Sequence, residues 1–520
     1  MMLLHHRRIR LFVSLLPRLV TVLLGVMMDP PATCGAERPH IVLIYADDMG
    51  YGDLGAQNPE SRIPTPHLDR LAAQGLRCTD VHSSSGVCTP SRYALLTGRY
   101  HWRKFHGIVN SFEPPALSDK EWTLPEMLKA AGYRTACIGK WHLGWEWEAI
   151  RRPGAEPRGE EGGRKRGFSA AAFDWSRPIP GGPCSHGFDY YFGDDVPNFP
   201  PYAWFENDRV IAPPTRDLEI TQQTAEGGWE CRPGPMVDGW DFEAVSPRLV
   251  DRAVEWIGQQ REAPEPFFLY LPLNGPHAPM LPTREFRGKS QAGGYGDYMA
   301  QMDGHVGRVL QTLEDHGLSE RTLVIFTSDN GPERYAYERL RVFGHRSAGP
   351  LRGLKRDLHE GGHRVPFLVR WPGHIAAGRV SDQLMGQMDL LATIAAVVGA
   401  EIPEHAADDS YNLLPTWLGN APSPRQTIVH NTFPDAYAIR HGQWLLIAAE
   451  SGHHSEVPAW FSERNGYQED GLPGELYDLQ NDLSQRQNQF AERPEKVAEM
   501  SQLLQRIRQA GQVRTATRGD

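Results

Sequence analysis

A cysteine in a short polar segment is the first residue of this chain that could do chemistry. Cys88 begins Cys-Thr-Pro-Ser-Arg, two residues before a proline and four before Arg92. A lone cysteine is more often a small buried residue or half of a disulfide than a reactive group. The segment therefore offers either packing or chemistry, and the residues elsewhere in the chain decide between them.

Two pairs of oxygen-bearing side chains follow predicted strands. Asp47 and Asp48 come directly after a branched apolar run, and Asp329-Asn330 closes a second one. Adjacent carboxylates at the carboxyl edge of a parallel sheet repel each other unless a cation lies between them. The structural alternatives are an ordinary surface pair and an Asx turn. Three carboxylates and an amide, without histidine or thiol, suit Ca²⁺ or Mg²⁺ and suit Zn²⁺ poorly.

Three later segments supply cations and hydrogen-bond donors. Lys140 and His142, in Gly-Lys-Trp-His, project to one face if that segment is extended. His277 lies between two prolines, and Lys355 lies in a basic segment. Each has a structural alternative: a solvated lysine, a packed histidine or a basic surface loop. Together with Arg92, these residues could bind a compact oxyanion group.

Taken in order, these motifs resemble the formylglycine-dependent sulfatases of the alkaline phosphatase-like superfamily. The matching pieces are Asp-Asp, Cys-x-Pro-Ser-Arg followed by Leu-Leu-Thr-Gly-Arg, Gly-Lys-x-His, Gly-Pro-His, Ser-Asp-Asn-Gly and the lysine before Glu-Gly-Gly. They span roughly residues 38 to 375, with weaker matches at His186 to Gly193 and at Glu475 to Leu479. One departure is Leu354-Lys355-Arg356, where many relatives have a glycine beside the lysine.

The resemblance implies a modified nucleophile and a metal. A formylglycine-generating enzyme would oxidise Cys88 to formylglycine, whose hydrated aldehyde attacks sulfur and later expels sulfate. Ca²⁺, with Mg²⁺ as the less favoured ion, would bind the modified residue and the four oxygen-bearing side chains: Asp47, Asp48, Asp329 and Asn330. Asp329 would take a proton from the hydrated aldehyde, while His277 and Lys355 assist the leaving oxygen. The remaining catalytic residues would orient the nucleophile and neutralise charge: Arg92, Lys140 and His142.

Two other functions remain open. A phosphonate or phosphate ester hydrolase of the same superfamily would use a similar site, and a non-catalytic binder of sulfated glycans would keep Cys88 unmodified. Among sulfate esters, a sulfated carbohydrate is favoured over an aryl sulfate, because Trp145, Trp147 and Trp175 could stack on sugars. The sequence does not indicate the oligomeric state.

The elements around these motifs predict an α/β fold with a large mixed, mostly parallel sheet between layers of helices. Strands are expected at 40–46, 133–138, 267–273, 322–327 and 366–370, and helices at 124–131, 249–260, 298–316 and 387–398. We assign residues 37–415 to a catalytic domain and 416–520 to a smaller α+β subdomain. That subdomain should contain antiparallel strands at 427–431, 436–440 and 444–449 and a terminal helix at 494–510. Residues 146–183 read as a solvated loop that shapes substrate access.

Charge and targeting signals limit the partners. The net charge of −10 and pI near 6.1 argue against nucleic acid as a ligand. Residues 1–36 read as an export signal, so the mature protein should be periplasmic or secreted. A retained signal anchor or a lipid at Cys34 is the minor alternative, and no later segment predicts a membrane span. Cys184 and Cys231 either pair or stay reduced.

Overall fold

The computed structural model describes residues 38–161, 164–165, 167–219, 231–468 and 470–513. The predicted export signal at 1–36 and Cys34 lie outside these residues. Within them, no helix combines the length and the apolar character needed to cross a membrane.

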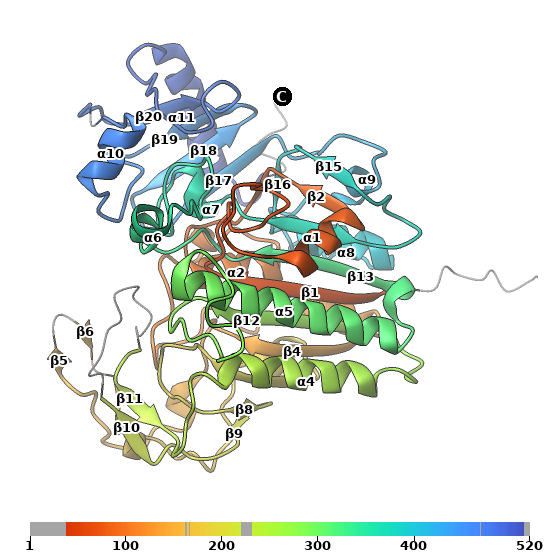
Figure 1. The fold of residues 1–520 in the computed structure, drawn as a ribbon. Helices are drawn as coiled ribbons and strands as arrows, with labels where there is room; N and C mark the ends of the chain where they lie inside the picture. The colour runs from red at the N-terminus through yellow and green to blue at the C-terminus, as the bar shows by residue number, and fades with distance from the viewer. Residues whose placement is uncertain (1–37, 162–163, 166, 220–230, 469, 514–520) are drawn as a thin grey trace, which may run out of the picture. The chain divides into compact units, whose positions relative to one another are not determined.

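A ten-stranded sheet runs through the described chain (Figure 1). Its strands are, in spatial order, β15 (Arg379–Ser381), β2 (Leu76–Cys78), β14 (Phe367–Arg370), β13 (Thr322–Ser328), β1 (His40–Asp47), β12 (Phe267–Pro276), β4 (Arg134–Lys140), β7 (Tyr190–Asp195), β8 (Phe205–Glu206) and β9 (Arg209–Val210). The middle five strands, β13 to β7, are parallel, whereas β14 and β8 run against their neighbours. Every residue of β1, β12 and β13 is buried, as expected for strands covered on both faces.

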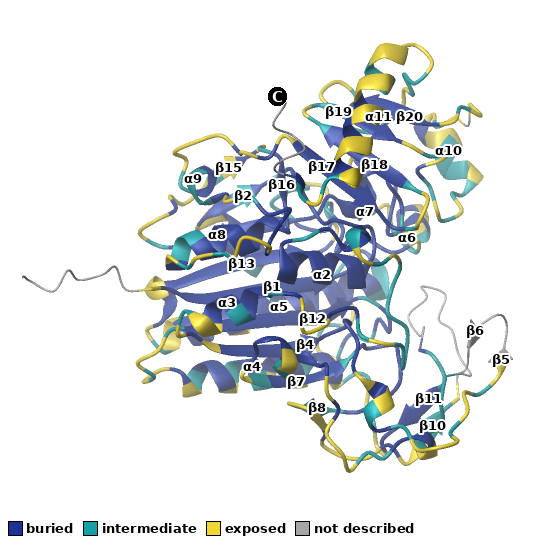
Figure 2. Ribbon diagram, turned by 180° about the vertical axis from the view of Figure 1, so that it is seen from behind, coloured by how far each residue is buried: buried dark blue, intermediate teal, exposed yellow. Residues whose placement is uncertain are grey.

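Helices cover both faces of this sheet. One face packs against α1 (Pro66–Ala73), α4 (Val245–Gln259) and α5 (Gly293–Asp315), of which α4 and α5 lie in front in Figure 1. The other packs against α2 (Cys88–Thr97), α3 (Leu124–Ala130) and α8 (Asp389–Val398), as seen from behind in Figure 2. The predicted α/β architecture, with a mostly parallel sheet between two helical layers, is confirmed.

The long helix α5 begins five residues earlier than its apolar pattern predicts. Its first turn contains Gly293, Gly294 and Gly296, residues that disfavour a helix by propensity. Tertiary packing overrides that preference. A side chain at Gly296 would meet Ser290 Oγ at 2.4 Å, so the close approach of the preceding loop requires glycine at this position.

A four-stranded antiparallel sheet forms in the C-terminal part of the chain. It contains β17 (Thr427–Asn431), β18 (Tyr437–His441), β19 (Trp444–Ile447) and β20 (Glu475–Asp478), in that order. The helices of this part are α10 (Ala459–Asn465) and α11 (Pro494–Gln509). The expected α+β content is confirmed, while the boundary at residue 415 stays a prediction.

Shorter elements complete the described part of the fold. Three pairs of short strands form, namely β3 (Val81–His82) with β16 (Met385–Gly386), β5 (Glu160–Glu161) with β6 (Arg164–Lys165), and β10 (Arg216–Leu218) with β11 (Gly234–Met236). The short helices are α6 (Ala336–Phe343), α7 (Glu360–His363) and α9 (Leu414–Trp417). The β3 strand leads directly into the segment that carries Cys88.

The loop prediction for 146–183 is wrong in part. Trp147, Phe173 and Ile179 are buried in the main apolar core, so this segment is partly a cover for the sheet. Trp145 is fully buried as well. The hypothesis that Trp145 and Trp147 stack on sugars is therefore also wrong, because aromatic side chains on neighbouring strands and turns already pack against them.

The proposed disulfide does not form between Cys184 and Cys231. The Cys184 thiol lies 3.7 Å from Asn207 Oδ1, and burial raises the pKa of this thiol to about 11. Of the two expectations for this pair, the structure shows reduced cysteines.

Candidate active site and metal centre

The ends of β1 and β13 bring two acidic segments together. The two strands are parallel neighbours, and the last register pair joins Ala46 to Ser328. Asp47 and Asp329 therefore leave the same edge of the sheet. The backbone N–H of Asp48 donates a hydrogen bond to Asp329 Oδ1 at 3.1 Å. All three carboxylates are buried.

Asp48 lies at the centre of this group. Lys355 Nζ donates to its two carboxylate oxygens at 2.6 and 2.8 Å, and the Asn330 amide donates to Oδ1 at 2.7 Å. The amide oxygen of Asn330 is buried and accepts no hydrogen bond from any residue of the described ranges. A buried acceptor of this kind beside three carboxylates fits a hard divalent cation, which binds oxygen ligands.

Cys88 is the first residue of α2 and is almost fully buried. Its Sγ lies 3.7 Å from Asp47 Oδ1. Burial raises the pKa of the Cys88 thiol to about 12, and the nearby carboxylates oppose the effect of Lys140 and Lys355. Because the thiolate is the nucleophilic form of cysteine, this side chain is a poor nucleophile as a thiol.

Two buried cations hold the carboxylates in place. Arg92, one helical turn after Cys88, donates to Asp329 Oδ2 through Nε at 3.2 Å and Nη2 at 2.8 Å. Lys140, the last residue of β4, donates to Asp47 Oδ2 at 2.6 Å. Although burial opposes ionisation, Lys140 lowers the pKa of Asp47, so this carboxyl stays charged. The Arg92 guanidinium also donates to the Lys140 carbonyl at 3.1 Å, which joins the two cations in one network.

Two histidines complete the group. His142 donates from Nε2 to the Val109 carbonyl at 3.1 Å, which leaves Nδ1 as a buried acceptor without a partner in the described chain. Burial and then Lys140 lower the pKa of His142 well below its usual value, so the ring is neutral. His277 donates from Nδ1 to the Ala278 carbonyl, and its Nε2 faces Asp48 Oδ2 at 3.7 Å.

All the residues that the sequence singled out therefore lie at one edge of the sheet. We call this set the strand-end cluster: Asp47, Asp48, Cys88, Arg92, Lys140, His142, His277, Asp329, Asn330 and Lys355. Four ligand-type groups of the set, three of them buried, have atoms within 4.8 Å of one another: Asp47, Asp48, Cys88 and His277. The arrangement can bind a divalent cation and a tetrahedral oxyanion on one side of Cys88.

Sequence reasoning missed two supports of the cluster. Glu333 is buried three residues after Asn330, and its Oε2 lies 3.8 Å from Lys355 Nζ. Asp53 accepts hydrogen bonds from the Gly50 backbone, the Tyr295 hydroxyl and the His345 ring, and so fixes the loop after Asp48. Glu333 gave a weak signal, as a charge directly after the Asp-Asn-Gly-Pro turn. Asp53 gave none, because its side-chain partners Tyr295 and His345 are distant in sequence.

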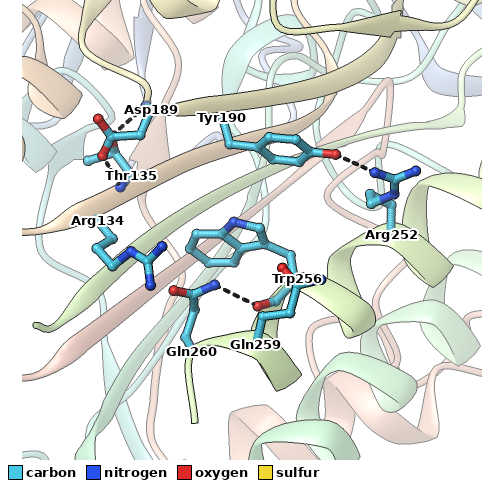
Figure 3. Close-up of a pocket in the computed structure, with 8 residues that line it drawn as sticks. All are labelled: Arg134, Thr135, Asp189, Tyr190, Arg252, Trp256, Gln259 and Gln260. Carbon is cyan, nitrogen blue, oxygen red and sulfur yellow. Dashed lines mark hydrogen bonds between the residues drawn. The ribbon is translucent and has the colours of Figure 1, made fainter. Parts of the chain in front are cut away.

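A cavity of about 320 Å³ lies elsewhere on the sheet (Figure 3). Its lining residues are Arg134, Thr135, Asp189, Tyr190, Arg252, Trp256, Gln259 and Gln260. Arg134 is the first residue of β4, whereas Lys140 of the strand-end cluster is the last. This cavity and the cluster therefore lie at opposite ends of the same strand, and the cavity takes no part in the chemistry at Cys88.

Comparisons with known proteins agree with this geometry. A family model for sulfatases matches residues 39–400. An N-acetylgalactosamine-6-O-sulfatase of Bacteroides thetaiotaomicron is 33% identical over 515 residues, which cover 91% of this chain and 94% of the relative. Arylsulfatase A of Homo sapiens is 34% identical and covers 87% of this chain and 83% of that protein.

The fold has similar relatives among solved structures. A sulfatase described within the metabolism of multiple glycosaminoglycans by Bacteroides thetaiotaomicron superposes with a TM-score of 0.75 at 31% identity. The match covers 91% of this chain and all of that one. A divalent-metal site is general in this family, and the strand-end cluster fits one. The chain therefore belongs to the sulfatase family and is a sulfuric ester hydrolase.

Proposed function

We propose that this enzyme removes sulfate from glycosaminoglycan-type saccharides, using a formylglycine made from Cys88 and a Ca²⁺ ion bound by the strand-end cluster. The observation that carries the proposal is the environment of Cys88. A buried thiol with a raised pKa lies against Asp47, in reach of a set of cations that suits a sulfate group. The names of the relatives support a sulfated sugar as the substrate, among them N-acetylgalactosamine 6-sulfatases.

The modification would supply what a thiol at this position lacks. A formylglycine at residue 88 provides a hydrated aldehyde, with one oxygen to attack sulfur and a second hydroxyl to release sulfate afterwards. Asp47, Asp48, Asp329 and Asn330 would hold Ca²⁺, which supplies positive charge beside the nucleophile.

The other side chains have roles that follow from their contacts. Asp329, whose Oδ2 is held by the Arg92 guanidinium, is the carboxylate that would accept a proton from the hydrated aldehyde. Lys140 and Arg92 neutralise charge close to residue 88. His142, neutral and with a free Nδ1 acceptor, orients a hydroxyl group. His277 Nε2 and Lys355 Nζ, both directed at Asp48, are the donors placed to assist the leaving oxygen.

Mass spectrometry tests the modification directly. Cleavage after Arg77 and Arg92 releases one peptide, residues 78–92, that contains both Cys78 and Cys88. After alkylation, Cys78 should carry the label while residue 88 appears as an aldehyde. Cys78 is buried, lies in β2 and is not part of the signature segment, so it is an internal control for sample oxidation. Labelled thiols at both positions, in a host that has the modifying enzyme, would contradict the proposal.

A substrate panel tests the reaction. Sulfate release should be measured on N-acetylgalactosamine 6-sulfate, sulfated disaccharides, an aryl sulfate and the matched phosphate ester. We expect the highest kcat/KM on a sulfated saccharide. A faster reaction on the phosphate ester would instead favour the phosphate or phosphonate ester hydrolase alternative.

We also propose that the protein is exported, with residues 1–36 as its signal. The charged start, the apolar run and the small residues before Glu37 support this. N-terminal sequencing of the protein from the periplasm or medium should give a start near residue 37. A full-length chain in the cytoplasm would contradict export.

A further inference from the structure

Arg356, the residue that follows Lys355, has a backbone conformation that arginine rarely adopts. Its φ is +81°, in the left-handed region that favours glycine. Holding a side chain there strains the backbone. The sequence resemblance already set the segment Leu354-Lys355-Arg356 apart, because many relatives have a glycine beside the lysine. A strained arginine next to a catalytic lysine raises the question of what its side chain does.

The contacts of Arg356 tie it to the strand-end cluster. Its backbone N–H donates to the Gly86 carbonyl at 2.8 Å, two residues before Cys88. Its guanidinium donates through Nη1 to Glu333 Oε1 at 2.6 Å. The other oxygen of Glu333 lies 3.8 Å from Lys355 Nζ, so one buried carboxylate lies between two cations. Glu333 thus fixes where the guanidinium points.

Arg356 differs from the other cations of the cluster in its exposure. Its side chain is 34% exposed, compared with 4% for Lys355 and 0% for Arg92 and Lys140. Its Nε and Nη2 donate no hydrogen bond within the described chain. A guanidinium with one edge fixed and the other edge open to solvent is suited to bidentate binding of a planar or tetrahedral anion.

An aromatic pair from the C-terminal part lies close by. The rings of Phe433 and His454 stack at 3.8 Å. Burial and then the charge of Arg356 lower the pKa of His454, so this ring is neutral and near the guanidinium. A sugar ring beside Arg356 would therefore meet a partly apolar surface as well as a cation.

We propose that Arg356 binds a second anionic group of the substrate, a carboxylate or a second sulfate ester near the sulfate that is removed. This inference rests on the proposed function, since it requires a saccharide substrate. It makes Arg356 a specificity residue, which selects polyanionic sugars over sugars with a single sulfate. It also accounts for an arginine at a position whose backbone favours glycine.

The test compares substrates with and without a second anion. The three saccharides are a singly sulfated neutral monosaccharide, a disulfated monosaccharide, and a disaccharide with a uronate beside the sulfated sugar. An aryl sulfate is the fourth substrate. Arg356→Asn removes the charge and suits a positive φ, whereas Arg356→Lys keeps the charge without the planar fork.

For Arg356→Asn, we expect kcat/KM on the dianionic saccharides to fall about tenfold more than on the singly charged substrates, mainly through KM. Arg356→Lys should lose less. Comparing the loss of kcat/KM on the uronate disaccharide with the loss on the disulfated monosaccharide then shows which anion Arg356 binds. A loss of equal size on all four substrates, or no loss on any, would overturn the inference. If Arg356→Asn does not fold, the same comparison is made with Arg356→Lys.

A binding measurement separates this inference from the proposed function. Two inactive proteins are compared by calorimetry: Cys88→Ser, and the double variant that also contains Arg356→Asn. The double variant should bind the dianionic saccharide more weakly. Equal affinity with and without that change would overturn the role of Arg356 alone. If the modified wild-type enzyme cleaves the aryl sulfate but neither binds nor cleaves any sulfated saccharide, the proposed substrate class and this inference both fail.

Discussion

Two buried clusters of charge lie a few residues apart in this chain, and only one of them is built for chemistry. The second, which we call the interface cluster, contains Asp80, His82, Glu360, Arg364 and Arg440. Arg440 of β18 donates to both oxygens of Asp80 at 2.6 and 2.7 Å, and Arg364 donates to Glu360 at 3.0 Å. The interface cluster thereby joins the large sheet to the C-terminal sheet.

The two clusters differ in where their charges lie. In the interface cluster, two carboxylates alternate with two guanidinium groups, so each acid meets an arginine. In the strand-end cluster each carboxylate also meets a cation, but the acids lie beside Cys88 at the ends of parallel strands. Each cluster also holds an acceptor without a donor in the described chain, Asn330 Oδ1 in one and Glu360 Oε1 in the other. Buried charge by itself thus does not mark an active site. The mark is the position of the charges at the ends of parallel strands, next to a potential nucleophile.

The largest effect is expected from a substitution that removes the nucleophile and leaves the interface cluster intact. Cys88→Ser should lower kcat by 10³ or more, the scale expected for loss of a nucleophile, because serine can capture sulfate but cannot expel it as a hydrated aldehyde does. The measurement is turnover on the best saccharide, with a wild-type sample shown to be modified. Turnover near the wild-type rate would contradict the mechanism.

Breaking the interface cluster should affect stability instead. Asp80→Asn leaves Arg440 buried without its carboxylate, so we expect the free energy of unfolding to fall by about 3 kcal/mol. The measurement is urea unfolding at pH 7. Asp251→Asn, at an exposed pair with Arg308, is the control and should change stability by less than about 0.5 kcal/mol.

The activity of Asp80→Asn sharpens the comparison. At a temperature where the variant is folded, kcat should stay close to wild type, because Asp80 touches neither Cys88 nor the acidic group. A loss of kcat comparable to that of Cys88→Ser would show that the two clusters act as one unit.

Removal of the metal should affect the strand-end cluster and leave the interface cluster unchanged. Treatment with EGTA should abolish most activity and lower Tm, and Ca²⁺ should restore both. Saturation at a hundredfold excess over Kd adds about 2.7 kcal/mol of stability. Asp80→Asn should lose the same increment on treatment with EGTA, since both acids of its own cluster are paired with arginines and we place the ion at the strand-end cluster. If neither activity nor Tm changes on treatment with EGTA, a removable Ca²⁺ at the strand-end cluster is contradicted.

The acid side of the stability profile should report the interface cluster. Burial opposes ionisation of Glu360, but His82 and the arginines lower its pKa from 4.5 to about 2. A lowered carboxyl pKa contributes stability that is present above about pH 4.5 and is lost as the pH falls toward 2. The free energy of unfolding, measured from pH 6 to pH 3, should fall less steeply with decreasing pH in Glu360→Gln than in wild type. The same pH dependence of stability in both proteins would contradict this role of Glu360.

The last expected effect has the opposite pH dependence and lies beside the strand-end cluster. Burial raises the pKa of Asp194, near Lys140, to about 7. Its protonated form contributes stability that is complete below the unfolded pKa of 3.8 and is lost as the pH rises through 7. Asp194→Asn should therefore gain stability relative to wild type as the pH rises from 5 to 8, by roughly 1.4 kcal/mol for each pH unit up to pH 7. An equal difference in the free energy of unfolding between Asp194→Asn and wild type at pH 5 and at pH 8 would contradict this role of Asp194.

Much of the fold was predictable because its strands are continuous apolar runs. The runs that begin at His40, Phe267 and Thr322 are buried on both faces, and such strands leave little freedom in where they start. Helix starts were less predictable, as the glycine-rich beginning of α5 shows. The tryptophans were misplaced because aromatic residues serve cores and sugar sites equally well, and sequence pattern cannot tell which.

The sequence alone determined which residue types meet at this site, because cysteine, paired acids and cations follow strand ends in a fixed order. Only the tertiary structure decided their partners. It placed the Asn330 oxygen without a donor in the described chain, Glu333 between two cations, and Arg356 in a strained conformation with its side chain open to solvent. Those properties depend on contacts between segments that are 23 residues apart for Glu333 and Arg356 and 282 apart for Asn330 and Asp48, and no local pattern encodes them.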